Sequence, residues 1–134
     1  MSILVTDAGF QPCPHTPIVA LADIAQHQGA VTLAHTDMPE AVLPYLSTIT
    51  LICVTFPAFN DGRAFTIARR LRALGYDATL RAVGPVIADQ YAMARRVGFD
   101  QVEIPDSLAA RQPQEQWLAR ADWRDHHYLA RLRA

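Results

Sequence analysis

The sequence contains no lysine, although it contains twelve cationic side chains, all of them arginine, in 134 residues. A lysine Schiff base, a lysine general base and the lysine of a phosphate-binding loop are therefore excluded. Any bound anion must be held by arginine side chains or by backbone N–H groups. The formal net charge of −1 gives no general attraction to nucleic acid or to an anionic membrane, so we expect neither as a partner.

Cysteine is also scarce, because Cys13 and Cys53 are the only two in the chain. This excludes a disulfide framework and a cysteine-rich metal site. Cys53 lies in the most apolar segment, which predicts a buried packing residue. The adjacent His126 and His127 would point in different directions on a helix and do not form a zinc-binding pair. We predict no metal and no cofactor.

Long hydrophobic runs are missing as well. The longest, residues 49–59, is too short to span a bilayer, and the first residues lack the basic start of a signal peptide. We therefore expect a cytoplasmic protein. Apolar residues make up 51% of the chain and charged residues 19%, which is typical of a folded globular domain.

Along the rest of the chain, sequence patterns typical of strands alternate with patterns typical of helices. Residues 48–56 are β-branched and apolar without alternation, as in a strand covered on both faces. Gly75 and Gly98 are placed to end helices, and Asp37 is placed to begin one. Strands are predicted at 3–5, 30–34, 48–56, 78–83 and 101–104, and helices at 18–28, 63–74 and 86–97.

A short internal repeat supports this organisation, since Gly75-Tyr76-Asp77 recurs as Gly98-Phe99-Asp100 before the next strand. Repeated strand–helix–strand units imply parallel strands joined by right-handed crossovers. We predict an α/β fold with an open, mostly parallel sheet of about four or five strands and helices on both faces. A half-barrel of βα units is the alternative.

Two regions are expected along the chain. Residues 1–106 form the α/β domain, with the core of the motif at 48–104. Residues 107–134 form a helical tail that carries both tryptophans and packs either on the domain or on a second subunit, which would make a homodimer.

Candidate site residues follow the predicted strands, because loops at the carboxyl ends of parallel strands line the usual binding site. After the strand at 48–56, Gly62 allows a backbone conformation that other residues resist, and Asp61 can cap the following helix. Arg63 lies in the first turn of that helix, against the helix dipole, which indicates that it faces an anion or Asp61.

Arg81 lies inside a predicted buried strand, where a guanidinium needs a partner. Asp61, Asp89 and Glu103 are the candidates. We predict that Arg63, Arg81, Gly62 and Gln90 bind a small anion, and that Asp61 and Asp89 are candidate catalytic acid–base groups. In the alternative interpretation, all of these residues brace the fold.

The segment 56–104 resembles the bacterial domain of unknown function 934 family. The resemblance rests on Phe56-Pro57-x-Phe59-x-Asp61-Gly62-Arg63, on Leu80-Arg81-Ala82-Val83-Gly84, on Asp89-Gln90 and on Gly98-Phe99-Asp100. Members of that family are commonly encoded beside assimilatory sulfite reductase and are often labelled probable oxidoreductases of sulfite reduction. Val97 stands where the family often has a cysteine, which argues against cysteine redox chemistry here.

The resemblance implies an accessory or partner-binding role in assimilatory sulfate and sulfite reduction, with a small-anion pocket. Sulfite reductase or another sulfate-assimilation protein would be the partner. Two alternatives stay open: an enzyme acting on a small anionic sulfur compound or a sugar phosphate, and a purely structural or interaction module. The sequence leaves open whether the protein is an enzyme.

Overall fold

The computed structural model describes residues 2–58 and 62–123, so Asp61 and the end of the tail lie outside the described residues. Seven strands form one mixed sheet in the order β2-β1-β7-β6-β5-β4-β3. They are β1 (Ser2–Thr6), β2 (Gly9–Pro12), β3 (Val19–Ala20), β4 (Ala30–Leu33), β5 (Leu51–Thr55), β6 (Thr79–Val83) and β7 (Gln101–Pro105).

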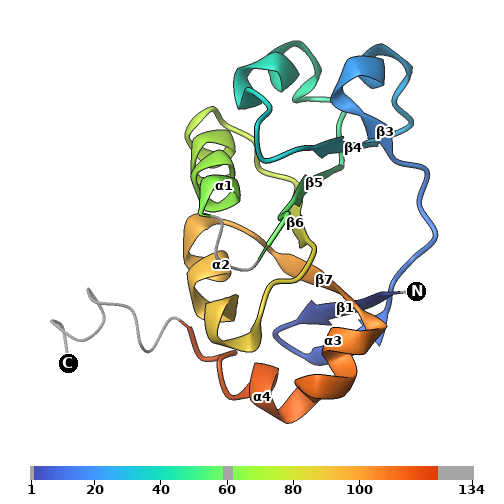
Figure 1. Cartoon of the computed structure of the whole chain (residues 1–134). Helices are drawn as coiled ribbons and strands as arrows, with labels where there is room; N and C mark the ends of the chain where they lie inside the picture. The colour runs from blue at the N-terminus through green and yellow to red at the C-terminus, as the bar shows by residue number, and fades with distance from the viewer. Residues whose placement is uncertain (1, 59–61, 124–134) are drawn as a thin grey trace, which may run out of the picture.

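The strands from β3 to β7 are parallel, and each lies beside its neighbour in the sequence. Right-handed crossovers between such strands all fall on the same face of the sheet. The connections are η1 (Leu21–Gln26), η2 (Pro39–Tyr45), α1 (Arg63–Ala73), and η3 (Ala88–Gln90) followed by α2 (Tyr91–Val97). In Figure 1 the sheet curves into an arc, with α1 and α2 on its convex side.

The predicted α/β class and the mostly parallel sheet are confirmed, but the sheet has seven strands rather than four or five. The helices gather on one face, so the half-barrel alternative describes the arrangement. β1 is antiparallel to both β2 and β7 and extends the sheet by a hairpin. The chain then runs across the open, concave side of the arc, through residues 13–18, to reach β3 (Figure 1).

The N-terminal third differs most from the sequence prediction. The expected helix at 18–28 is wrong at its start, because β3 comes first and only the short 3-10 helix η1 follows. The expected N-cap role of Asp37 is also wrong. Met38 occupies the N-cap position of η2, and the Asp37 carboxylate accepts the backbone N–H of Ala34 at 2.8 Å.

The main core lies between the sheet and the convex-side helices. It contains alternate strand residues such as Ile52, Leu80 and Val102. Two further helices, α3 (Asp106–Arg111) and α4 (Gln114–Leu118), close the end near β1 and β2. Trp117 of α4 is 1% exposed and packs edge-on against Tyr91, with 6.1 Å between the ring centroids. This part of the tail therefore packs on the domain.

The internal repeat is a repeated arginine clamp. Arg72 lies three residues before Gly75 and donates to the carbonyl of Tyr76 at 2.8 Å, and Arg95 makes the equivalent bond to Phe99 at 2.6 Å. Both arginines also pair with Asp100, at 2.8 and 3.8 Å. The clamps tie the ends of α1 and α2 to the chain entering β6 and β7.

Asp7 in the β1–β2 turn joins the hairpin to α2. Its carboxylate accepts the Tyr91 hydroxyl at 2.5 Å, Arg95 at 3.1 Å and the indole N–H of Trp123 at 3.3 Å. Burial acts to raise the pKa of Asp7, but these hydrogen bonds and the Arg95 charge outweigh burial and lower the pKa. The ionised carboxylate is thus a structural part of the hairpin.

We predict that Gly84→Ala destabilises the domain by about 2 kcal/mol or more. Gly84 has a φ of +134°, and a Cβ there would lie 2.4 Å from the Phe56 carbonyl oxygen. Gly62→Ala is the control, because among the described residues, its chain neighbours apart, no atom lies within 4 Å of its Cβ position and its φ is −85°. It should change stability by less than about 1 kcal/mol in urea unfolding. Equal effects of the two substitutions would contradict this account.

We predict that Asp7→Asn makes stability less dependent on pH in the acid range. The pKa of Asp7 is lower in the folded than in the unfolded state, so its contribution is present at neutral pH and is lost as the pH falls below about 4. In urea unfolding at pH 7, the free energy of unfolding of Asp7→Asn should be about 1 kcal/mol lower than that of the wild type. This difference should become smaller at pH 3. Asp23→Asn, at an exposed position of η1, is the matched control and should change stability at pH 7 by less than about 0.5 kcal/mol. A difference that stays constant with pH would contradict the assignment.

Candidate functional site

Arg81 points to the concave face of the sheet. The strand register aligns it with Cys53 of β5 and Gln101 of β7. Side chains alternate between the two faces along a strand, and the neighbours Leu80 and Ala82 belong to the core beneath the helices. Arg81 therefore sits in the middle of the face that the helices leave uncovered.

The guanidinium of Arg81 is enclosed by polar partners from β7 and from the N-terminal chain. Its side chain is 5% exposed. Nε donates to the Gln101 side-chain oxygen at 2.7 Å, and Nη1 donates to Glu103 at 3.2 Å and lies 3.9 Å from the Cys13 sulfur. Glu103 also accepts the Ser2 hydroxyl at 2.9 Å. The charge of Arg81 is thus neutralised inside the sheet by Glu103, which is one of its three predicted partners.

The structure does not bring Arg81 and Asp89 into one pair. Asp89 accepts Arg120 at 2.8 Å, in an ion pair whose two side chains are largely exposed. The Gln90 side-chain oxygen accepts the Ile87 N–H at 3.1 Å and caps the start of η3. Two of the predicted site residues therefore have contacts of their own at the carboxyl end of β6, and the predicted Arg81–Asp61 pair lies outside the described residues.

Gly62 and Arg63 begin α1. The expectation that Gly62 has a conformation other residues resist is wrong, because its φ of −85° and ψ of −4° are open to any residue. Arg63 is exposed in the first turn. An N-terminus of this kind carries a partial positive charge, so an anion at this position stays a prediction.

The two thiols flank the Arg81 cluster and are held protonated. Burial raises the pKa of Cys53 to about 11, and the Arg81 charge offsets this only in part. Burial, followed by a hydrogen bond to Glu103, raises the pKa of Cys13. The predicted burial of Cys53 is confirmed. Because the thiolate is the reactive form, both thiols are poor nucleophiles at neutral pH.

The described parts of the chain contain neither a metal-binding cluster nor a helix that could span a membrane. Between residues 2–58 and 62–123, no group of three or more histidine, cysteine or acidic side chains could hold a metal ion. Within the same residues, no helix has the length and apolar character needed to cross a bilayer.

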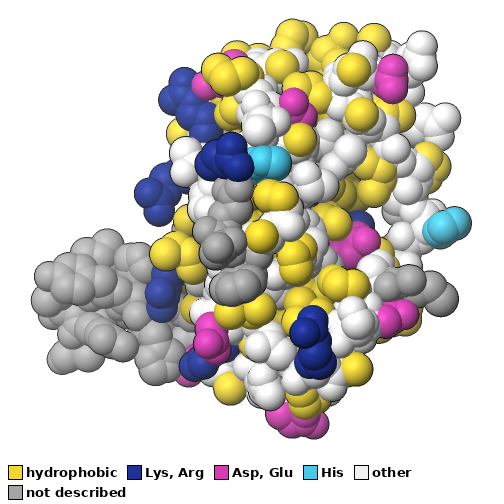
Figure 2. All heavy atoms as spheres, viewed as in Figure 1, with side chains coloured by type: hydrophobic (Ala, Val, Ile, Leu, Met, Phe, Trp, Pro, Cys, Tyr) yellow, Lys and Arg dark blue, Asp and Glu magenta, His cyan; other side chains and the backbone are white. Residues whose placement is uncertain are grey.

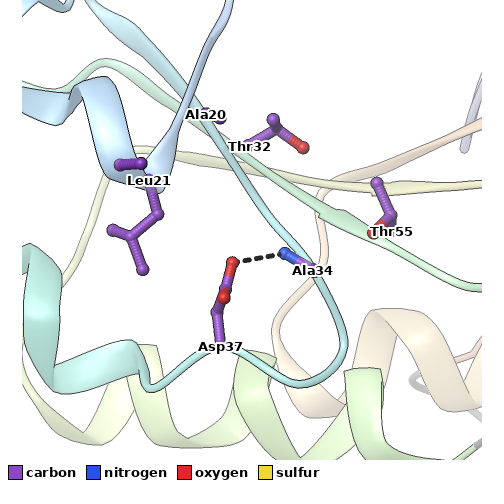
Figure 3. A pocket seen from close by; sticks show the side chains of 7 residues that line it. Ala20, Leu21, Thr32, Ala34, Asp37 and Thr55 are labelled. Carbon is purple, nitrogen blue, oxygen red and sulfur yellow. Dashed lines mark hydrogen bonds between the residues drawn. The ribbon is translucent and has the colours of Figure 1, made fainter.

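A hollow of about 480 Å³ lies at the carboxyl ends of β3, β4 and β5. Its walls are Ala20, Leu21, Ala22, Thr32, Ala34, Asp37 and Thr55. Figure 3 shows the Asp37 carboxylate pointing into the space between Leu21 and Ala34. This is the edge of a parallel sheet at which ligands usually bind. Sequence reasoning missed it because alanine and threonine carry no chemical signature.

The comparisons with known proteins give a family and no activity. A family model described as "Bacterial protein of unknown function (DUF934)" matches residues 30–132. The chain belongs to this family. Neither the curated proteins nor the solved structures include a significant match. The match to DUF934 contains Arg81, Gln101 and Glu103 but begins after the β1–β2 hairpin, so Ser2 and Cys13 lie outside the matched part of the cluster.

We predict that Arg81→Met destabilises the protein by about 3 kcal/mol, because it leaves Glu103 without its cation in a largely buried position. The double variant Arg81→Met/Glu103→Gln should recover a large part of this loss, since no unpaired charge remains. Urea unfolding of wild type, both single variants and the double variant measures the coupling.

The exposed pair provides the matched control. Arg120→Met should cost less than about 1 kcal/mol, because Arg120 and Asp89 are well solvated. Strict additivity of the Arg81 and Glu103 substitutions would contradict the pairing.

Proposed function

We propose that this protein is an accessory, partner-binding component of assimilatory sulfite reduction rather than an enzyme. The observation that carries the proposal is the Arg81–Glu103 pair on the concave face. The pathway is supported by the resemblance of segment 56–104 to proteins encoded beside sulfite reductase.

The pair matters because Arg81, the best candidate for holding an anion, already has Glu103 as its ionic partner. An anion at Arg81 would have to compete with Glu103 and with the 2.7 Å bond to Gln101, both fixed by the neighbouring strand. The free energy of binding such an anion would be small, because one buried ionic partner of Arg81 would only replace another. Asp89 likewise pairs with Arg120. Arg81, Gln101 and Glu103 thus stabilise the half-barrel. We therefore place partner binding on surfaces at its edges.

The hollow beside β3, β4 and β5 has room for a side chain of a protein partner. Leu21 and the surrounding alanines supply apolar contact, and Asp37 supplies a negative charge. A side chain with an apolar stem and a donor or cationic end complements both features. We propose that sulfite reductase or another sulfate-assimilation protein supplies this side chain.

The small-anion pocket stays a separate prediction, now centred on Gly62 and Arg63 at the start of α1. An enzyme acting on a small anionic sulfur compound or a sugar phosphate would need it. Calorimetry with sulfite, sulfate and phosphate on wild type and Arg63→Ala tests this alternative, which predicts saturable binding that the substitution removes.

We predict that Ala22→Arg abolishes co-purification with sulfite reductase at native expression levels. Ala22 is an exposed wall of the hollow, so a long cationic side chain there fills the hollow and pairs with Asp37 without disturbing the core. Gene deletion should impair growth on sulfate and leave growth on cysteine unchanged, and Ala22→Arg should fail to restore growth on sulfate.

Ala25→Arg is the matched control, because Ala25 is exposed on the same element and does not line the hollow. It should co-purify and support growth like the wild type. Equal growth of the deletion strain on both sulfur sources would refute the pathway assignment. Undiminished co-purification of Ala22→Arg would refute the hollow as the contact.

A further inference from the structure

A separate groove lies between α1 and α2, on the convex side of the sheet. It has a volume of about 280 Å³. Its lining residues are Gly62, Phe65, Thr66, Arg69, Met93 and Val97. Met93 is 48% exposed, which is a large solvent contact for an apolar side chain on a helix. The groove is therefore an apolar depression that residues 2–58 and 62–123 leave open to water.

The charges around this groove are all of one sign within the two helices. The sequences of α1 (RAFTIARRLRA) and α2 (YAMARRV) contain no acidic residue. Figure 2 shows arginine side chains distributed along the side of the molecule where Figure 1 places these helices. The net charge of the whole chain is −1, so this cationic character is local.

The arginines of the two helices differ in what they contact. Arg72 and Arg95 are the internal clamps, and Arg70 pairs with Glu40 at 2.6 Å. Arg69 is exposed and forms no ion pair with any residue of 2–58 or 62–123. Among the same residues, Arg96 donates only to the Trp123 backbone carbonyl, at 3.3 Å. The Arg69 guanidinium, which lines the groove, is thus available to a carboxylate.

We propose that the α1–α2 groove binds an acidic amphipathic segment of a partner protein. An apolar side chain of that segment enters the groove between Phe65 and Met93, and one of its carboxylates pairs with Arg69. Amphipathic helices bind grooves in this way, through an apolar anchor flanked by polar contacts. Guanidinium groups suit the polar contacts of such a segment, because they bind carboxylates through two parallel hydrogen bonds.

This inference depends on the proposed function only in treating the protein as partner-binding. The groove is on the convex side, whereas the hollow near Asp37 is at the carboxyl edge of the sheet. The two surfaces can therefore be tested separately, and each can fail without the other.

The test measures fluorescence anisotropy of labelled helical peptides with the full-length protein. The probe has leucine on one face and glutamate on the other. Two comparison peptides carry lysine in place of glutamate, or the same composition in shuffled order. We expect the glutamate probe to bind roughly tenfold more tightly than either comparison peptide, with an affinity that falls as salt rises.

Two substitutions locate the site. Met93→Asp should weaken probe binding roughly tenfold by placing a carboxylate in the groove, and Arg69→Glu should do the same by reversing the charge at its rim. Leu43→Asp is the control for the first, because Leu43 is 45% exposed on η2. Arg111→Glu, at an exposed position of α3, is the control for the second. Both controls should bind like the wild type.

Any of three results overturns the inference: no binding of the glutamate probe, equal binding of the lysine peptide, or binding that Met93→Asp and Arg69→Glu leave unchanged. Thermal unfolding of each variant confirms that all are folded, as expected for exposed positions. If the wild-type protein bound the probe but did not co-purify with sulfite reductase, the proposed pathway would be contradicted while the groove inference would stand.

Discussion

The structure depends on one constraint, which is that five parallel strands follow one another in spatial order as they do in sequence. Right-handed crossovers then place every connection on the same side, and the sheet curves away from the helices. Among the described residues, the opposite face is crossed by the extended chain of residues 13–18 (Figure 1). Its central side chains must therefore satisfy one another, and Arg81, Gln101 and Glu103 do so across β6 and β7.

Arginine is the cation that this architecture uses. Arg72 reaches the carbonyls of Tyr76, Ala78 and Gly98 as well as the Asp100 carboxylate. A planar group with five donors can hold several acceptors in one fixed arrangement, which the single ammonium of lysine cannot. The absence of lysine, which in the sequence excludes several chemistries, is matched in the structure by clamps that need arginine for their geometry.

The sequence predicted the second half of the fold well, because its signals there are local. Helical spacing and the glycines at 75 and 98 define α1, α2 and the strands around them without reference to the rest of the chain. β2 and β3 were missed because they are short and are stabilised by pairing with partners distant in sequence. The uniformly apolar β5 predicted cover on both faces, but curvature of the sheet also buries a concave side, and a strand pattern does not distinguish these two causes.

The candidate site could be predicted only in part from the sequence, for a similar reason. A buried arginine in a strand predicts a partner, and Glu103 was one of three choices, but selecting it requires the register of β6 against β7. The hollow at Asp37 requires the positions of three strand ends and is lined by residues without chemical signature. Nothing in a linear sequence brings Ala20, Ala34 and Thr55 together.

The position of each charge decides what it can contribute to binding. Arg81 is fixed by strand register to Gln101 and Glu103, so a ligand that reached it would first have to displace interactions equal to those it offers. Arg69 has no such partner among the described residues, and a carboxylate that approaches it gains an ion pair without breaking one. The free energy available for recognition is therefore greatest at the edges and helical surface of the half-barrel, and smallest at its most polar interior point.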